Sequence, residues 1–444
     1  MHGTTRGKAG TSAAPAADLS ADHGEAMHRL VTELYPLCRS ITGDGVRQTL
    51  AALLAYIPLN VCEVPSGMEV FDWTVPQEWN IRDAYIKNGA GERVVDFRAH
   101  NLHVVGYSTP INARMTLAEL RPHLFSDPAH PDWIPYRTSY YKETWGFCLS
   151  HRQLEALPED DYQVVIDSSL EPGHLTYGEL VLRGSSTDEV LISCHVCHPS
   201  LANDNLSGIA VATALAQQLA ARELRYTYRL LFIPGTIGAI TWAALRQAHL
   251  GKIKHGFVLT CVGDGGHPTY KVSRRGNAEI DQAWRYVLQQ SGAAFEILPF
   301  SPFGYDERQF CSPGLNLPVG CLMRTPHGKF PEYHTSADNP SFVRPEGLHD
   351  TLQLALTTID VIENNRRYRN QKPMCEPRLG KYGLYSSIGG QSASDYQMAL
   401  LWLLNMSDGD HTVLDIAERA ALPWDLIKQA TQALLAAELL KAAD

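Results

Sequence analysis

The 444-residue chain is 44% hydrophobic and 19% charged, an ordinary balance for a folded protein that argues against wholesale disorder. Its 38 basic and 48 acidic residues give a net charge of −10, so the chain as a whole offers nucleic acid no electrostatic attraction. No apolar run reaches the roughly 18 residues of a membrane span, and nine cysteines, an odd number in a long chain, favour reduced thiols.

The N-terminal part predicts a tail followed by helices. Residues 1–22 are small and polar and lack the apolar segment of a secretory signal, so we expect a flexible tail and a cytoplasmic protein. Apolar residues at helical spacing then predict one helix around Met27–Leu37 and a second from Gly45 to about Ile57.

The segment after these helices has a different sequence pattern. Between about residues 68 and 154, short alternating runs are broken by Asn, Asp, Gly and Pro, and four of the tryptophans gather there. This pattern predicts a small β-rich domain of hairpins and turns.

Strand and helix patterns alternate over residues 155–372. The predicted strands are continuous apolar runs, as expected of strands buried on both faces: Val190–Cys194, Arg229–Ile233, Phe257–Val262 and Leu317–Leu322. Such alternation predicts an α/β domain with a mostly parallel sheet flanked by helices, into which residues 68–154 are inserted. Residues 23–67 and 155–372 make up this domain. In such folds, ligands bind at the loops that leave the carboxyl ends of the strands.

Three short helices with turns between them predict a winged-helix-like module over residues 375–444. Between Cys375 and Asp444 there are five basic and nine acidic residues. Phosphate contacts need Lys and Arg, so we expect a packing or protein-contact module and no nucleic-acid partner.

The loop after the first buried strand carries the densest set of reactive side chains. His195, His198, two cysteines and Asp204 lie within eleven residues. Imidazole and carboxylate together suit zinc or another transition metal. The same residues also fit a structural loop in which Asp204 caps the following helix, and the two interpretations have equal weight at this point.

Three later loops belong to the same edge of the sheet. His334 lies among turn-forming residues before the last helix, Asp264 follows the third strand in a Gly-rich loop, and Asp306 and Glu307 stand beside Arg308. For the acids, a solvated turn or a local ion pair is an equal alternative to a functional role.

These motifs resemble a known family. Asp204–Gly208 matches the Asp-Asn-x-Ser-Gly signature of the M28-type zinc aminopeptidases, the superfamily of the transferrin receptor and glutaminyl cyclase. The chain more closely resembles bacterial aminopeptidase-like proteins with an inserted β domain and a C-terminal winged helix, often labelled polysaccharide-biosynthesis proteins. The motifs that carry this likeness are Phe71–Trp79, Cys197–Ser200, Asp306–Gln309 and Glu332–Asp338. The resemblance implies a mixed, mostly parallel sheet.

The resemblance also implies a metal site. His198 resembles the first histidine ligand, Asp204 the carboxylate that bridges two metals in the active enzymes, and His334 the last ligand. Asp264 lies a few residues after the place of the family's Asp ligand and is the nearest candidate for it.

Two departures from the family pattern change the expected chemistry. Gly235 stands where the bacterial aminopeptidase-like proteins have a Glu and where the active aminopeptidases have their catalytic base. Ser200 stands where the active enzymes have an Asp that orients the first histidine ligand. The active enzymes carry two adjacent Glu in the run around Gly235, one a general base and the next a metal ligand, and losing that ligand favours one zinc ion over two. Losing the base removes a contribution of about 10²–10⁴ in rate, so Glu307 or Asp306 would have to replace it.

The resulting prediction is a zinc-dependent hydrolase that acts on an amide bond of a small aminoacyl or peptide-like substrate. The alternative is a metal-binding homologue without peptidase activity, serving as a ligand-binding or biosynthetic protein for a surface polysaccharide or secondary metabolite. A scaffold or regulator is the third hypothesis. Large aminopeptidase-like domains often self-associate, so the resemblance is compatible with a homo-oligomer, but the sequence does not give the oligomeric state.

Overall fold

The structure is a computed structural model that describes residue 19 and residues 22–384 and 394–443. The tail expected at residues 1–22 lies almost wholly outside the described residues.

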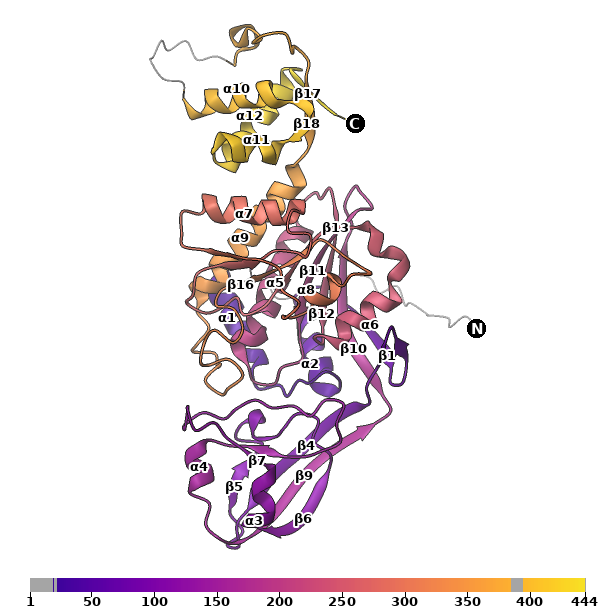
Figure 1. The fold of residues 1–444 in the computed structure, drawn as a ribbon, viewed down its shortest axis with the longest axis vertical. Coiled ribbons are helices and arrows are strands. Elements are labelled where there is room, and N and C mark those ends of the chain that lie inside the picture. The colour runs from indigo at the N-terminus through magenta and orange to yellow at the C-terminus, as the bar shows by residue number, and fades with distance from the viewer. Residues whose placement is uncertain (1–18, 20–21, 385–393, 444) are drawn as a thin grey trace, which may run out of the picture. The chain divides into compact units, whose positions relative to one another are not determined.

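An eight-stranded mixed sheet forms the centre of the α/β domain (Figure 1). Its order is β1 (Asn60–Pro65), β10 (His174–Leu182), β12 (Thr227–Ile233), β11 (Glu189–His195), β13 (Ile253–Leu259), β16 (Val319–Met323), β14 (Thr269–Lys271) and β15 (Glu296–Leu298). The central strands β12, β11, β13 and β16 are parallel, whereas β1, β10 and β14 pair antiparallel. The predicted mixed, mostly parallel sheet is confirmed.

Helices cover both faces of this sheet. On one face α6 (Ile237–Leu245) and α8 (Glu307–Phe310) share a buried cluster with strand side chains such as Tyr177 and Leu231. On the other, α5 (Ser207–Ala220) packs on β11 and on α1 (His23–Leu34), and α2 (Asp44–Leu53) packs on β10. Consecutive strand residues point to opposite faces, and Gly178, next to Tyr177, faces Leu50 of α2.

The inserted β-rich domain has its own antiparallel sheet in the order β5 (Arg93–Asp96), β4 (Glu78–Lys87), β9 (Asp161–Glu171) and β6 (Ile111–Thr116). A separate buried cluster that includes Tyr162, Val164 and Ile166 supports it. The sheet therefore uses residues beyond 154, because β9 alternates buried and exposed positions and continues the insert before β10 returns to the main sheet.

The remaining short elements of the first 276 residues lie in the insert or in loops of the α/β domain. They are β2 (Glu69–Val70), β3 (Trp73–Thr74), η1 (Asn101–His103), α3 (Leu117–Leu120), η2 (Arg121–His123), β7 (Leu124–Phe125), β8 (Phe147–Cys148), α4 (His151–Glu155), η3 (Ala202–Leu206) and η4 (Gln247–Lys252).

A second compact unit contains residues 277–295 and 353–444. Its elements are α7 (Glu279–Gln290), the C-terminal part of α9 (Pro345–Asn364), β17 (Arg367–Asn370), η5 (Leu379–Tyr382), α10 (Asp395–Met406), β18 (Asp408–Thr412), α11 (Val413–Ala420), α12 (Trp424–Ala436) and β19 (Leu440–Ala442). β17 pairs with both β18 and β19, which completes a winged helix that begins before residue 375. The Tyr286 hydroxyl of α7 donates to the Leu422 carbonyl (2.5 Å), which joins α7 to this unit.

No helix in the described part of the chain is both long and apolar enough to cross a bilayer.

Candidate metal centre

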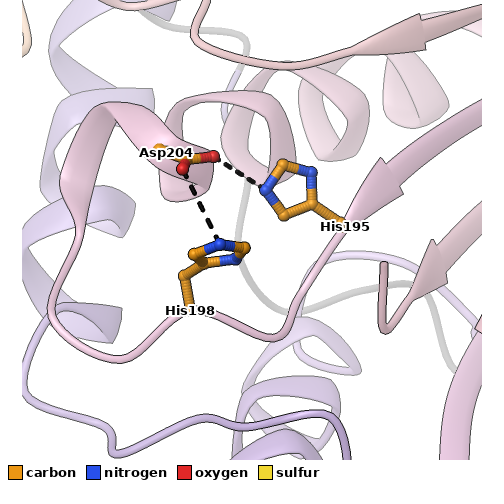
Figure 2. Close-up of side chains that lie close together, drawn as sticks. All are labelled: His195, His198 and Asp204. Atoms are coloured by element: carbon orange, nitrogen blue, oxygen red, sulfur yellow. Dashed lines mark hydrogen bonds and ion pairs between the residues drawn. The ribbon is translucent and has the colours of Figure 1, made fainter. Parts of the chain in front are cut away.

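The carboxyl end of β11 delivers the first two side chains of the site. β11 is buried along its whole length and ends at His195, and the chain then loops through His198 before η3 carries Asp204 to the start of α5. His195 Nε2 lies 2.8 Å from Asp204 Oδ1, and His198 Nε2 lies 3.7 Å from Asp204 Oδ2. Figure 2 shows both imidazoles directed at the carboxylate. One ligand atom from each of the three residues lies within 4.8 Å of the others.

Asp204 collects further partners from loops distant in sequence. His334 Nε2 is 2.9 Å from Asp204 Oδ2, and the Tyr305 hydroxyl donates to the carboxylate (2.8 Å to Oδ2). Burial alone would raise the pKa of Asp204, but His198 and the bonds from His195 and His334 hold that pKa well below its usual range. The structure therefore contains an ionised, fully buried carboxylate among three imidazoles.

The inserted domain positions the loop that carries His334. The Tyr136 amide donates to the His334 carbonyl (2.7 Å), and Ile134 and Ser336 exchange hydrogen bonds beside it. On its other side, the Asp338 carboxylate accepts the amides of Asn203 (2.6 Å) and Asp204 (3.0 Å). These bonds fix the His334 loop to both the insert and η3.

Asp264 does not join this group of potential ligands. Its carboxylate accepts hydrogen bonds from the side chain of Asn203 (2.9 Å), the amide of Gly266 (2.6 Å) and the hydroxyl of Thr325 (2.7 Å). Asp264 therefore braces the loops around the centre, and its carboxylate is not in the group of ligand atoms that lie within 4.8 Å of one another.

The two acids expected to replace the missing base are both fully buried, and neither lines the cavity described below. Glu307 pairs with Lys271 (2.5 Å) and accepts the Tyr305 amide (3.0 Å). Asp306 lies against Gly235: a Cβ atom placed there would be 3.4 Å from Asp306 Oδ1 and 3.1 Å from His195 Cβ. Burial raises the pKa of Asp306 to about 7.

His195 is the residue that the sequence reasoning passed over. It stood in the metal-binding loop, yet the resemblance selected His198 as the first ligand. His195 could have been found from its position: it is the last residue of the buried strand β11, at the ligand-binding edge of the sheet. Both imidazoles belong to the group.

A cavity of about 280 Å³ opens onto the centre. Its Trp and Tyr side chains come from the insert, the His334 loop and the loop before α8. The lining residues are Ile41, Trp73, Tyr136, Thr138, Tyr140, Tyr141, Cys197, His198, Gly235, Thr236, Ile237, Gly304, Tyr305, Arg308, Tyr333 and His334.

The donor atoms fit a transition-metal ion. Imidazole nitrogen and carboxylate oxygen are the ligands that zinc takes in catalytic sites. Metal binding needs neutral imidazole, and burial lowers the pKa of His198 to about 3, which keeps that ring neutral. His195 Nδ1 is buried without a hydrogen-bond partner in the described part of the chain. The residues present can therefore hold a metal at Asp204.

Comparison with known proteins assigns the chain to a family. Residues 28–365 match the model of a domain of unknown function, DUF4910, and residues 366–442 match a winged helix-turn-helix model. The chain belongs to the DUF4910 family. A relative from Clostridium acetobutylicum is 51% identical over 95% of this chain and 97% of its own length, and its name assigns it provisionally to polysaccharide biosynthesis with an aminopeptidase-like domain.

Solved structures support the same assignment of fold. A crystal structure from Clostridium acetobutylicum, provisionally named a peptidase, superposes on this DUF4910 chain with a TM-score of 0.91 at 49% identity, covering 96% of this chain and 97% of the other. A zinc aminopeptidase from Bacillus subtilis gives 0.56 at 11% identity, covering 76% and 94%. A Shewanella amazonensis M28 peptidase precursor gives 0.52 at 16%, covering 76% and 93%. The predicted aminopeptidase-like fold and the C-terminal winged helix are confirmed.

Proposed function

We propose that the DUF4910 chain is a zinc-dependent hydrolase of amide bonds, with one zinc ion held by His195, His198 and Asp204, whose ligand atoms lie within 4.8 Å of one another. His334, hydrogen-bonded to Asp204, lies beside these ligands, and three protein ligands leave the ion a position for water or substrate. The supporting observation is the convergence on one buried carboxylate of imidazoles, His195 and His334, that lie about 140 positions apart in the chain. A zinc ion bound there would polarise the scissile carbonyl and lower the pKa of a bound water.

The protein's own residues prepare the site for this reaction. The Tyr305 hydroxyl holds the Asp204 carboxylate in place, and Tyr333 in turn hydrogen-bonds Tyr305 (2.8 Å). Aromatic side chains line the cavity, and a substrate that displaces water from it would strengthen the electrostatic contacts inside. Of the two acids expected to replace the missing Glu, we propose Asp306 in a positioning role behind Gly235 and beside His195, because Glu307 is already paired with Lys271.

Metal analysis and a hydrolysis assay test the proposal together. We expect about one zinc per chain after loading and dialysis, and release of amine from a small aminoacyl amide that stops on chelation and returns with zinc. Asp204→Asn should lose both the zinc and the activity. The matched control Asp264→Asn alters an acid of the neighbouring loops that is not a ligand, and should keep the zinc. Wild-type protein with well under one zinc per chain would contradict the proposal.

A second candidate is a metal-binding homologue without peptidase activity, which Gly235 favours. Among the described residues that line the cavity there is no Asp or Glu, so no carboxylate stands where the family's base projects. Gly235→Glu tests this candidate, with Gly235→Ala controlling for the crowding of a side chain against His195 and Asp306. A gain of aminoacyl amide hydrolysis in the Glu variant alone would show that peptidase chemistry had been lost at this position.

For the winged helix we propose a packing role and no nucleic-acid partner. Lys428 is the one basic residue of α12. Its ammonium group pairs with Asp360 of α9 (2.5 Å), and the Trp424 indole donates to the same carboxylate (2.8 Å). A lysine that is already paired with a carboxylate is not available to bind the phosphates of nucleic acid. A gel-shift titration with duplex DNA at low salt should show no complex at micromolar protein, and tight binding would refute the packing role.

A further inference from the structure

We propose that the substrate of this centre carries an oxyanion, a carboxylate or a phosphate, on its acyl group, and that Arg308 binds that oxyanion. The inference rests on the proposed function and names the substrate class of the same site. It distinguishes this chain from an aminopeptidase, whose substrate brings a cationic amino group next to the scissile bond.

The first argument is the charge of the cavity. Among the described residues that line it, Arg308 is the one with a permanent formal charge, and there is no Asp or Glu. A desolvated ammonium group needs a carboxylate partner, because burying an unpaired charge is costly. The cavity lacks such a partner beyond the metal centre itself, and Gly235 removes the acid that the family pattern would place there. An anionic group is the better electrostatic match.

The second argument is the state of the Arg308 guanidinium. Its Nε atom donates to the Gly304 carbonyl (3.1 Å), which anchors the side chain to the loop that carries Tyr305. In the described part of the chain no carboxylate lies within 4.0 Å of its nitrogens, whereas Arg47 and Arg229 are each paired with two Glu residues. In the described part of the chain the terminal nitrogens of Arg308 make no hydrogen bond, and the residue lines the cavity. A guanidinium fork matches carboxylate and phosphate geometry.

The third argument is the apolar setting of that charge. Trp73 and Tyr141 pack against each other with ring centroids 5.6 Å apart and remain 45% and 57% exposed. Both line the cavity together with Tyr136 and Tyr140. Once a ligand fills the cavity, these rings leave less water around the guanidinium, so an Arg–oxyanion contact contributes more to binding than it would on an open surface.

Three hydroxamates that differ in charge test the inference by calorimetry on the zinc-loaded full chain. Each has the same metal-binding group: acetohydroxamate is neutral, succinic monohydroxamate is anionic and alanine hydroxamate is cationic. We expect the anionic compound to bind about tenfold or more tighter than the cationic one, the size of a charged hydrogen-bonded contact. Phosphonoacetohydroxamate then separates the two sources of the oxyanion, since its rank against the succinic compound shows which one fits better.

Variants assign the preference to Arg308. Arg308→Gln should reduce the ratio between anionic and cationic ligands about tenfold, and Arg308→Lys should restore it in part. Arg275→Gln is the matched control, because Arg275 also donates Nε to a backbone carbonyl (Asn316, 2.9 Å) but does not line the cavity, and its ratio should stay at the wild-type value.

The outcomes distinguish a failure of this inference from a failure of the proposed zinc-dependent function. Hydroxamate binding that ignores ligand charge, or that favours the alanine compound, would overturn the substrate class and leave the metal site intact. A preference that survives in Arg308→Gln would overturn the role of Arg308. Loss of all hydroxamate binding in zinc-treated protein would overturn the proposed function and this inference together.

Discussion

Asp204 is the residue on which the centre depends, and its state is set by neighbours that are not themselves ligands. The Tyr305 hydroxyl donates to the carboxylate, while Asp338 holds the backbone amide of Asp204 from the other side. Partners of this outer layer orient a ligand before the metal arrives. The metal affinity of the chain is therefore a property of Tyr305 and Asp338 as well as of the three imidazoles.

Removing the Tyr305 hydroxyl isolates this contribution. Tyr305→Phe should weaken zinc binding about 10–100-fold, the usual effect of losing an outer partner of a ligand, because Asp204 loses a hydrogen bond that fixes its orientation. Competition with a zinc-selective fluorescent chelator measures the change. Tyr333→Phe serves as the control, since it removes only the hydroxyl that bonds Tyr305 and should shift the affinity by much less. Equal effects of the two variants would contradict the role of Tyr305.

Asp306 predicts a pH dependence of stability. Burial raises its pKa from the ordinary 3.8 to about 7, so between those values the folded chain keeps a proton that the unfolded chain has released. Its contribution to stability is therefore full below about pH 4 and is lost as the pH rises toward and through 7. In the metal-free chain, Asp306→Asn should gain stability relative to wild type from pH 5 to pH 8, measured by urea denaturation at each pH. A difference that does not change with pH would refute the assignment.

At the scale of elements, the loop before α8 holds Tyr305 against the centre by means of a buried ion pair. Lys271 on β14 contacts Glu307 on α8 (2.5 Å) and donates to the Phe303 carbonyl of the intervening loop (2.8 Å). Lys271 and Glu307 are almost completely buried. The pair thus joins a strand, a helix and the loop that presents both Tyr305 and Arg308.

Breaking that pair on one side should be costly. Lys271→Met leaves the Glu307 carboxylate buried and uncompensated, and we expect a loss of about 3–5 kcal/mol in the free energy of unfolding. The double variant Lys271→Met with Glu307→Gln should recover much of this loss, because the remaining side chains are neutral. Chemical denaturation of the three proteins measures both effects. A single variant as stable as wild type would show that the pair has no structural weight.

The sequence predicted these elements better than it predicted what their loops do. Buried parallel strands have continuous apolar runs, so Val190–Cys194 could be assigned as a strand and the loops after the strands could be placed on one edge. The same reasoning placed His198, Asp204 and His334 at that edge, where the structure has them, and the resemblance then named them as ligands. Asp264 could not be judged from sequence, because a carboxylate in a Gly-rich loop serves equally well as a ligand or as an acceptor of local N–H groups. Nor does sequence show that Lys271 neutralises Glu307.

At the scale of the whole molecule, the chain divides into two compact units, and only one contains the metal centre. The sheet, the insert and all residues of the site belong to the first unit, whereas the winged helix with α7 forms the second. A ligand that binds one folded unit stabilises that unit by mass action and has no direct effect on the other. Thermal unfolding of such a chain is not expected to be a single two-state transition.

Calorimetry with and without zinc makes use of this division. At a free zinc concentration of about 100 times the dissociation constant, binding contributes about 2.7 kcal/mol to the folded first unit, which should raise its melting midpoint by about 3–6 °C. The transition of the second unit should stay where it is. Chelation should reverse the shift, and Asp204→Asn should abolish it while both transitions remain visible. Two results would place the metal outside the centre built around Asp204. Zinc would either shift the transitions of both units equally or shift only the transition of the second unit.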